Sequence, residues 1–113
     1  MNVTELVPRP IDRVRFTLKF QKTVPDKSGC YVLATCEDIV LYVGVSEDLK
    51  RRFGQHRDSS EKCSPMFEGF AYWFYWMECF SNELLRIERS WLNEHVEQHG
   101  SRPVLNKVDS PVS

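Results

Sequence analysis

Apolar and polar side chains alternate in the N-terminal part of the chain, between positions 14 and 20. A two-residue period is that of a strand with one buried face, so this stretch predicts an edge strand. The apolar positions of the stretch are Val14, Phe16, Leu18 and Phe20.

Two runs rich in β-branched and aromatic residues follow, over 30–35 and 39–45, and a short polar link between them predicts a hairpin. If the link holds two or four residues, positions whose numbers sum to 73 face each other. Tyr31 then pairs with Tyr42 on one face of the sheet. Two neighbouring hydroxyls could bind a phosphate or a water, although the hairpin alone favours plain aromatic packing.

The remaining pattern predicts two helices and one more strand. Ser46 resembles an N-cap, with acids in the first turn, and the first helix is expected to end near Arg57. The aromatic run over 70–77 suits a strand covered on both faces. A longer helix begins at Ser81 or Asn82, runs to about position 98 and stops before Gly100.

This order of elements predicts an α+β fold. A small antiparallel sheet of three core strands, possibly with a fourth N-terminal strand, is flanked by helices. We divide the chain into an N-terminal extension with the edge strand (1–24), the main domain (25–107) and a short tail (108–113). At 113 residues, one modest core is what the chain can build.

Composition and charge narrow the possible location and partners of the protein. No run of 18 apolar residues could span a membrane, and the N-terminus lacks the pattern of a secretory signal, so we expect a cytoplasmic protein. The net charge of −1 is unusual for a nucleic-acid binder. The charge is uneven, however: residues 1–27 carry six cations against three acids, and a second basic cluster surrounds Lys50, Arg51 and Arg52. One face could therefore meet phosphate.

The cysteines and two of the histidines offer little metal chemistry. No CxxC pair occurs, so we interpret the cysteines as reduced, small core residues. His95 and His99 are one helical turn apart, but without a third ligand nearby a solvated helix end is the simpler interpretation. The four cysteines are Cys30, Cys36, Cys63 and Cys79.

The first helix places two polar side chains on its buried side. Arg52 and His56 share a face with Leu49 and Phe53, because these positions follow the i, i+3, i+4, i+7 pattern. An arginine held against the domain could clamp a phosphate, and a histidine one turn away could move a proton near neutral pH. The alternative is an arginine that reaches solvent beside a half-exposed histidine.

Glu88 stands in the middle of the apolar stripe of the second helix. A carboxylate there must be paired, protonated or bound to a metal, because burial of a lone charge is costly. The apolar positions of this stripe are Leu84, Leu85, Trp91, Leu92 and Val96.

Several of these residues together resemble the GIY-YIG nuclease family. Gly29-Cys30-Tyr31 and, ten residues later, Tyr42-Val43-Gly44 resemble the paired tripeptides that name it. The other matching features are Arg52, ten residues after Tyr42; His56; the segment Leu85-Arg86-Ile87-Glu88; and the closing Pro103-Val104-Leu105-Asn106. The resemblance covers roughly residues 25–107. Cys30 stands where the family usually has isoleucine, and Val45 where some members have lysine.

The resemblance implies an endonuclease that hydrolyses DNA phosphodiester bonds with one divalent cation, Mg²⁺ or Mn²⁺, held by Glu88. Tyr42, with Tyr31 or His56, would take the proton of the attacking water. Arg52 would stabilise the transition state, and Asn106 would orient neighbouring groups. DNA is the expected partner, with target choice supplied by a protein partner or a homodimer.

Two other hypotheses remain. A catalytically silent module could keep the fold and act with a partner. An RNA-binding or structural protein could use the aromatic run for stacking, although such dense aromatics suit a core strand better.

Overall fold

The computed structural model describes residues 1–106; position 107 and the predicted tail at 108–113 lie outside the described residues. The short 3-10 helices carry the letter η. In chain order the elements are η1 (Val3–Glu5), β1 (Asp12–Arg15), η2 (Leu18–Thr23), β2 (Gly29–Ala34), β3 (Val40–Ser46), α1 (Leu49–Arg57), α2 (Ser60–Cys63), β4 (Trp73–Glu78), η3 (Ser81–Glu83) and α3 (Leu84–His99).

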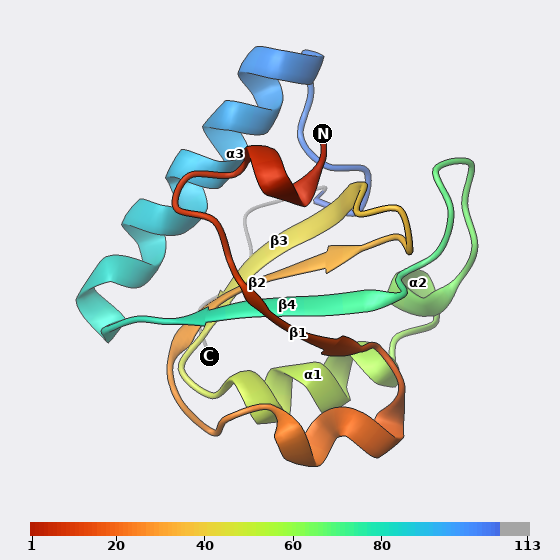
Figure 1. Cartoon of the computed structure of the whole chain (residues 1–113), viewed down its shortest axis with the longest axis vertical. Helices are drawn as coiled ribbons and strands as arrows, with labels where there is room; N and C mark the ends of the chain where they lie inside the picture. The colour runs from red at the N-terminus through yellow and green to blue at the C-terminus, as the bar shows by residue number, and fades with distance from the viewer. Residues whose placement is uncertain (107–113) are drawn as a thin grey trace.

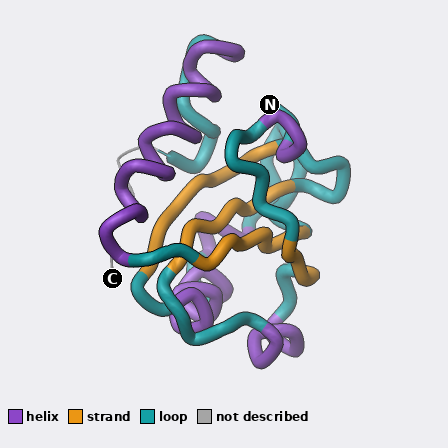
Figure 2. The backbone as a smooth tube through the Cα atoms, turned by 60° about the vertical axis from the view of Figure 1, so that its left-hand side comes forward, coloured by secondary structure: helices purple, strands orange, loops and turns teal. Residues whose placement is uncertain are grey.

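The strands form one antiparallel sheet in the order β1-β4-β2-β3. This confirms the α+β class and the fourth, N-terminal strand at an edge. In Figure 1 the sheet crosses the middle of the molecule, with α1 and η2 at the bottom and α3 at the upper left. The tube in Figure 2 shows the same separation of the helices by the sheet. In the described part of the chain, no helix is both long and apolar enough to cross a membrane.

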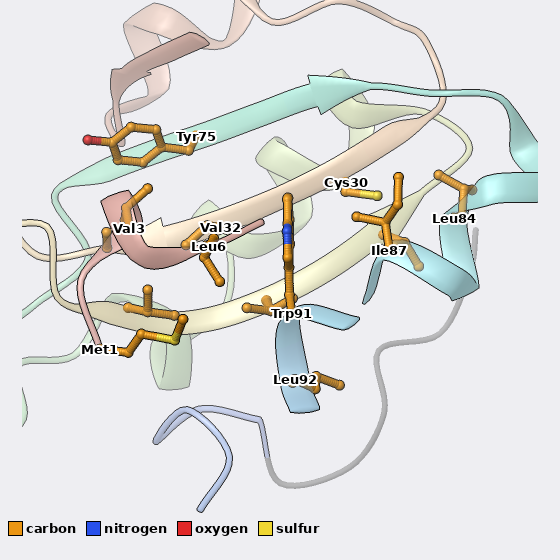
Figure 3. Close-up of a cluster of buried hydrophobic side chains, with 14 residues drawn as sticks. Met1, Val3, Leu6, Cys30, Val32, Tyr75, Leu84, Ile87, Trp91 and Leu92 are labelled. Atoms are coloured by element: carbon orange, nitrogen blue, oxygen red, sulfur yellow. The ribbon is translucent and has the colours of Figure 1, made fainter. Parts of the chain in front are cut away.

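Each face of the sheet carries its own core, so the expectation of a single core is wrong. On the α3 face, Trp91 and Ile87 pack with Cys30 and Val32 of β2, beneath the N-terminal segment (Figure 3). The Trp91 indole also donates a hydrogen bond to the Pro8 carbonyl at 2.8 Å. The N-terminal residues of this core are Met1, Val3 and Leu6. The start of the chain is thus packed against the body of the domain through Met1, Val3, Leu6 and Pro8.

The core on the α1 face is aromatic. Tyr31 stacks on Phe74 of β4, and Phe53 of α1 meets Phe74 edge-on, with ring centroids 5.2 and 5.0 Å apart. Phe16 closes the cluster against Phe53. Most of the aromatic run is therefore core, as the pattern predicts for its central positions, whereas Phe70 is exposed and lies before the strand begins.

The predicted N-terminal strand is too long. β1 ends at Arg15, the Thr17 amide turns back to the Arg15 carbonyl, and Leu18–Thr23 form η2 instead. Beyond this turn, Phe20 packs against the core on the α1 face, whereas Leu18 faces solvent. Apolar residues at every second position therefore continue from the strand into η2, and this spacing alone does not show where the strand ends.

The predicted hairpin register is also wrong. The loop has five residues, 35–39, and a bulge follows Leu33, so Tyr31 lies opposite Gly44 and Leu33 opposite Tyr42. Because the register moves by two positions, the tyrosines still share a face. Gly44 matters to this arrangement: a Cβ there would lie 2.4 Å from the Tyr31 hydroxyl.

The helix starts differ from expectation as well. Asp48, and not Ser46, caps α1, and its side chain accepts from the Arg51 amide at 3.0 Å. Ser46 ends β3.

The buried face of α3 differs in part from the predicted apolar stripe. Leu85 and Val96 are exposed, and the buried positions are Leu84, Ile87, Glu88, Trp91, Leu92 and His95. Gly100 ends the helix with a φ of 78°, as predicted.

Candidate functional site

Three rings from three elements meet on the α1 side of the sheet. The Tyr31 hydroxyl of β2 and the His56 Nε2 of α1 are hydrogen-bonded at 2.6 Å. Tyr42 of β3 lies edge-on to His56 and tilted to Tyr31, with centroids 5.2 and 6.0 Å apart. We call Tyr31, Tyr42 and His56 the ring cluster. The register error in the hairpin did not matter here, since diagonal neighbours on one face still meet.

The pitch of α1 brings His56 and Arg52 to this cluster. Both side chains are buried along with Leu49 and Phe53, as the helical spacing predicts. A residue that the sequence analysis missed joins them. Lys62 lies on the short helix α2, with its Nζ 4.8 Å from the centre of the Tyr42 ring. Its only signal in the sequence was a positive charge in an expected loop.

Burial and positive charge keep His56 neutral. Burial is the larger cause, and the charges of Lys62 and Arg52 add to it, so that the pKa of His56 falls to about 3. Near neutral pH the imidazole is therefore neutral, with a proton on one of its two nitrogens, and its Nε2 shares one hydrogen bond with the Tyr31 hydroxyl. A bound phosphate would offset the two cations and make His56 a better proton acceptor.

We expect this shift to appear as a loss of stability in acid. The unfolded histidine titrates near 6.5 and the folded one near 3, so the stabilisation is complete above pH 6.5 and falls as the pH drops toward 3. Between pH 6.5 and 4 the parent protein should lose about 3 kcal/mol more than His56→Gln. Urea unfolding of both proteins across this range measures the difference. Parallel pH curves for the two would contradict the buried, neutral His56.

Asn106 completes the outer edge of β3 beside the ring cluster. Its side-chain amide accepts from the Val43 N–H and donates to the Val43 carbonyl, both at 2.8 Å. The Leu105 amide adds a bond to the Leu41 carbonyl at 2.9 Å. These bonds fix the backbone on both sides of Tyr42.

Glu88 lies on α3 and is buried, with 4% of its surface exposed. It lines an open groove of about 450 Å³ together with Arg89 and Arg102. The negative charge of Glu88 also reaches the core: burial first, then Cys79 and Glu88, raise the pKa of the Cys30 thiol. The predicted burial of this carboxylate is thus confirmed. The described side chains that line its groove include no residue of the ring cluster and not Arg52.

Glu88 offers one carboxylate, which is the donor type that hard cations bind. Within residues 1–106, no three His, Cys, Asp or Glu side chains gather closely enough to form a metal site. Mg²⁺ keeps several waters and needs one or two carboxylates, whereas structural zinc needs four protein ligands. His95 directs its Nδ1 to the Ser101 carbonyl at 2.5 Å, which accounts for its burial without a metal.

The cysteines remain thiols, as expected. Cys30 is buried, and its sulfur lies 3.4 Å from that of Cys79 without a disulfide. Cys36 departs from the expectation of core residues because it is exposed on the hairpin loop.

Comparison with known proteins places this arrangement in a family. The model of the GIY-YIG catalytic domain matches residues 27–100. UvrABC system protein C of Prochlorococcus marinus (strain NATL1A) is 38% identical over 61 residues, which are 54% of this chain and 9% of that protein. The protein of the same name from Aster yellows witches'-broom phytoplasma is 26% identical over 89 residues, 77% of this chain and 15% of that protein.

A third relative, UvrABC system protein C of Finegoldia magna, is 49% identical over 43 residues, 38% of this chain and 7% of that protein. The chain thus spans less than a sixth of the length of these relatives. The family match covers both glycine–tyrosine motifs, α1 with its buried arginine and histidine, and all of α3. The chain belongs to the family of GIY-YIG catalytic domains.

Proposed function

We propose that this chain is a divalent-metal-dependent endonuclease that hydrolyses phosphodiester bonds in DNA. The observation that carries the proposal is the ring cluster, in which a phenol–imidazole hydrogen bond lies next to a second phenol and two cations. Its occurrence within a GIY-YIG catalytic domain supports phosphodiester chemistry.

In this proposal Tyr42 meets the attacking water, because Tyr31 is fully buried and Tyr42 retains some exposure. Tyr42 acts as its phenolate and becomes a neutral phenol when it takes the proton of the water. Tyr31 and His56 act through Tyr42 as positioning residues. The hydrogen bond between them holds the two rings against which the Tyr42 ring packs. Asn106 holds the β3 backbone on which Tyr42 stands.

Charge on the phosphate is balanced by two groups in the proposal. Arg52 presents a guanidinium to the equatorial oxygens as negative charge develops there. Glu88 would hold Mg²⁺ or Mn²⁺ through its carboxylate and waters. When bound, such a cation supplies Lewis-acid stabilisation of the scissile phosphate and the leaving oxygen.

Target choice is proposed to come from outside this domain. The ring cluster, Arg52 and Lys62 are suited to a phosphate group. Sequence information is carried by the base edges, for which the proposal assigns no side chain. A protein partner, or a second copy of the chain, would place the DNA.

A nicking assay tests the function directly. Purified chain is incubated with supercoiled plasmid at low salt, with 5–10 mM Mg²⁺ (about the range in which weak sites fill) or with EDTA. We expect relaxed circles only with the metal, and the same dependence with Mn²⁺. Intact plasmid under all metal conditions, from a folded protein, would favour the silent module instead.

A further inference from the structure

The two basic segments of the sequence, far apart along the chain, meet beside α1. η2 packs along the flank of α1 (Figure 1), and the Gln21 side chain donates to the Lys50 carbonyl at 3.0 Å. The join leaves an open groove of about 360 Å³. We call it the basic groove; it is lined by Leu18, Lys19, Gln21, Lys22 and Lys50.

The lysines of this groove have no acidic partner among residues 1–106. The lining contains three ammonium groups and no carboxylate. None of the ion pairs found in this part of the chain involves a groove lysine. Like charges gathered in one place repel each other, and a polyanion relieves that repulsion.

The groove is also held in a fixed shape. Gly54 of α1 approaches the Gln21 amide so closely that a Cβ would lie 2.5 Å from its nitrogen. The Leu49 and Lys50 amides bond the carbonyls of Lys27 and Pro25, which ties the chain after η2 to the start of α1. The backbone that carries these lysines is therefore held in place before a ligand binds, which lowers the ordering cost of binding.

We propose that the basic groove binds the phosphate backbone of duplex DNA, as a contact surface separate from the ring cluster. The proposal rests on the nuclease function above, which supplies DNA as the polyanion. α1 joins the two places: Lys50 faces the groove, while Arg52 and His56 face the rings. Nine of the sixteen acids belong to residues 58–113, which contribute nothing to the lining of the groove. This explains how a chain with net charge −1 can approach DNA by one side.

The test is the salt dependence of binding, measured without cleavage. Anisotropy of a fluorescein-labelled duplex of about 20 base pairs is followed in EDTA across 25–200 mM KCl, where each phosphate contact contributes about 0.9 to the log–log slope. Lys19→Gln/Lys22→Gln is expected to lower the slope by about 1.8 and to weaken binding by roughly 100-fold at the lowest salt.

Two matched variants interpret the result. Arg9→Gln/Arg86→Gln makes the same change of net charge outside the groove, and Lys19→Arg/Lys22→Arg keeps the charge inside it; both should retain the parent slope. An unchanged slope in the glutamine groove variant, or an equal loss in the Arg9/Arg86 variant, overturns the proposal. Groove-dependent binding by a chain that never nicks plasmid would leave this inference standing and remove the endonuclease function.

Discussion

Replacement of Glu88 by glutamine is expected to lower the rate of plasmid nicking at least ~1000-fold while the protein stays folded. A thousandfold loss corresponds to about 4 kcal/mol of transition-state stabilisation, which is within what a bound cation supplies. Glutamine keeps the size of this buried side chain but removes the charge that hard cations require. The nicking rate at saturating Mg²⁺ measures the effect.

Two companion variants and a measurement of stability make this result interpretable. Glu94→Gln alters an acid on the same helix outside the buried set and should nick within about twofold of the parent, as surface substitutions usually do. Glu88→Asp keeps the charge on a shorter stem and should recover part of the rate, more so with Mn²⁺. Thermal unfolding of each variant separates a chemical loss from a folding loss. A Glu88→Gln protein that cuts as fast as the parent would show that the metal is held elsewhere.

The parts of this site that the sequence predicts are those set by helix geometry. The α-helix has a fixed 3.6-residue period, so the spacing of Arg52 and His56 determines that both lie on the buried side of α1. The same period predicts the burial of Glu88 on α3, because this carboxylate stands among apolar residues that share one face of the helix. At Leu85 and Val96 the period failed, because the stripe facing the sheet is narrower than the apolar pattern.

The parts that the sequence does not predict depend on loops and on contacts between distant segments. The length of the hairpin loop sets the register of β2 against β3, and an irregular five-residue loop with a bulge has no simple sequence signature. The position of Lys62 over Tyr42 depends on the short α2, capped by Ser59. The hydrogen bonds of Asn106 to Val43 join residues 63 positions apart. The family resemblance singled out Asn106 but did not predict Val43 as its partner.

Arg52→Ala is expected to lower the cleavage rate by about 100-fold, equivalent to roughly 2.7 kcal/mol, because preorganised groups that face developing charge commonly contribute that much. Arg51→Ala is the matched control, since Arg51 is exposed on α1 and should change the rate by less than threefold, in line with surface positions. Arg52→Lys keeps the charge without the planar fork and should fall between the two. Single-turnover rates at saturating DNA separate this effect from weakened binding.

A second readout of Arg52→Ala does not depend on cleavage. Arg52 is one of the cations that lower the pKa of His56, so its removal should raise that pKa from about 3. Titration of the His56 ring by NMR in parent and variant measures this shift. If the cleavage rate falls and the pKa of His56 rises together, the positive charge of Arg52 acts at the ring cluster, where the phosphate is proposed to bind. A rate within threefold of the parent, with the pKa of His56 unmoved, would instead reduce Arg52 to a packing residue whose stem fills the space beside Phe53.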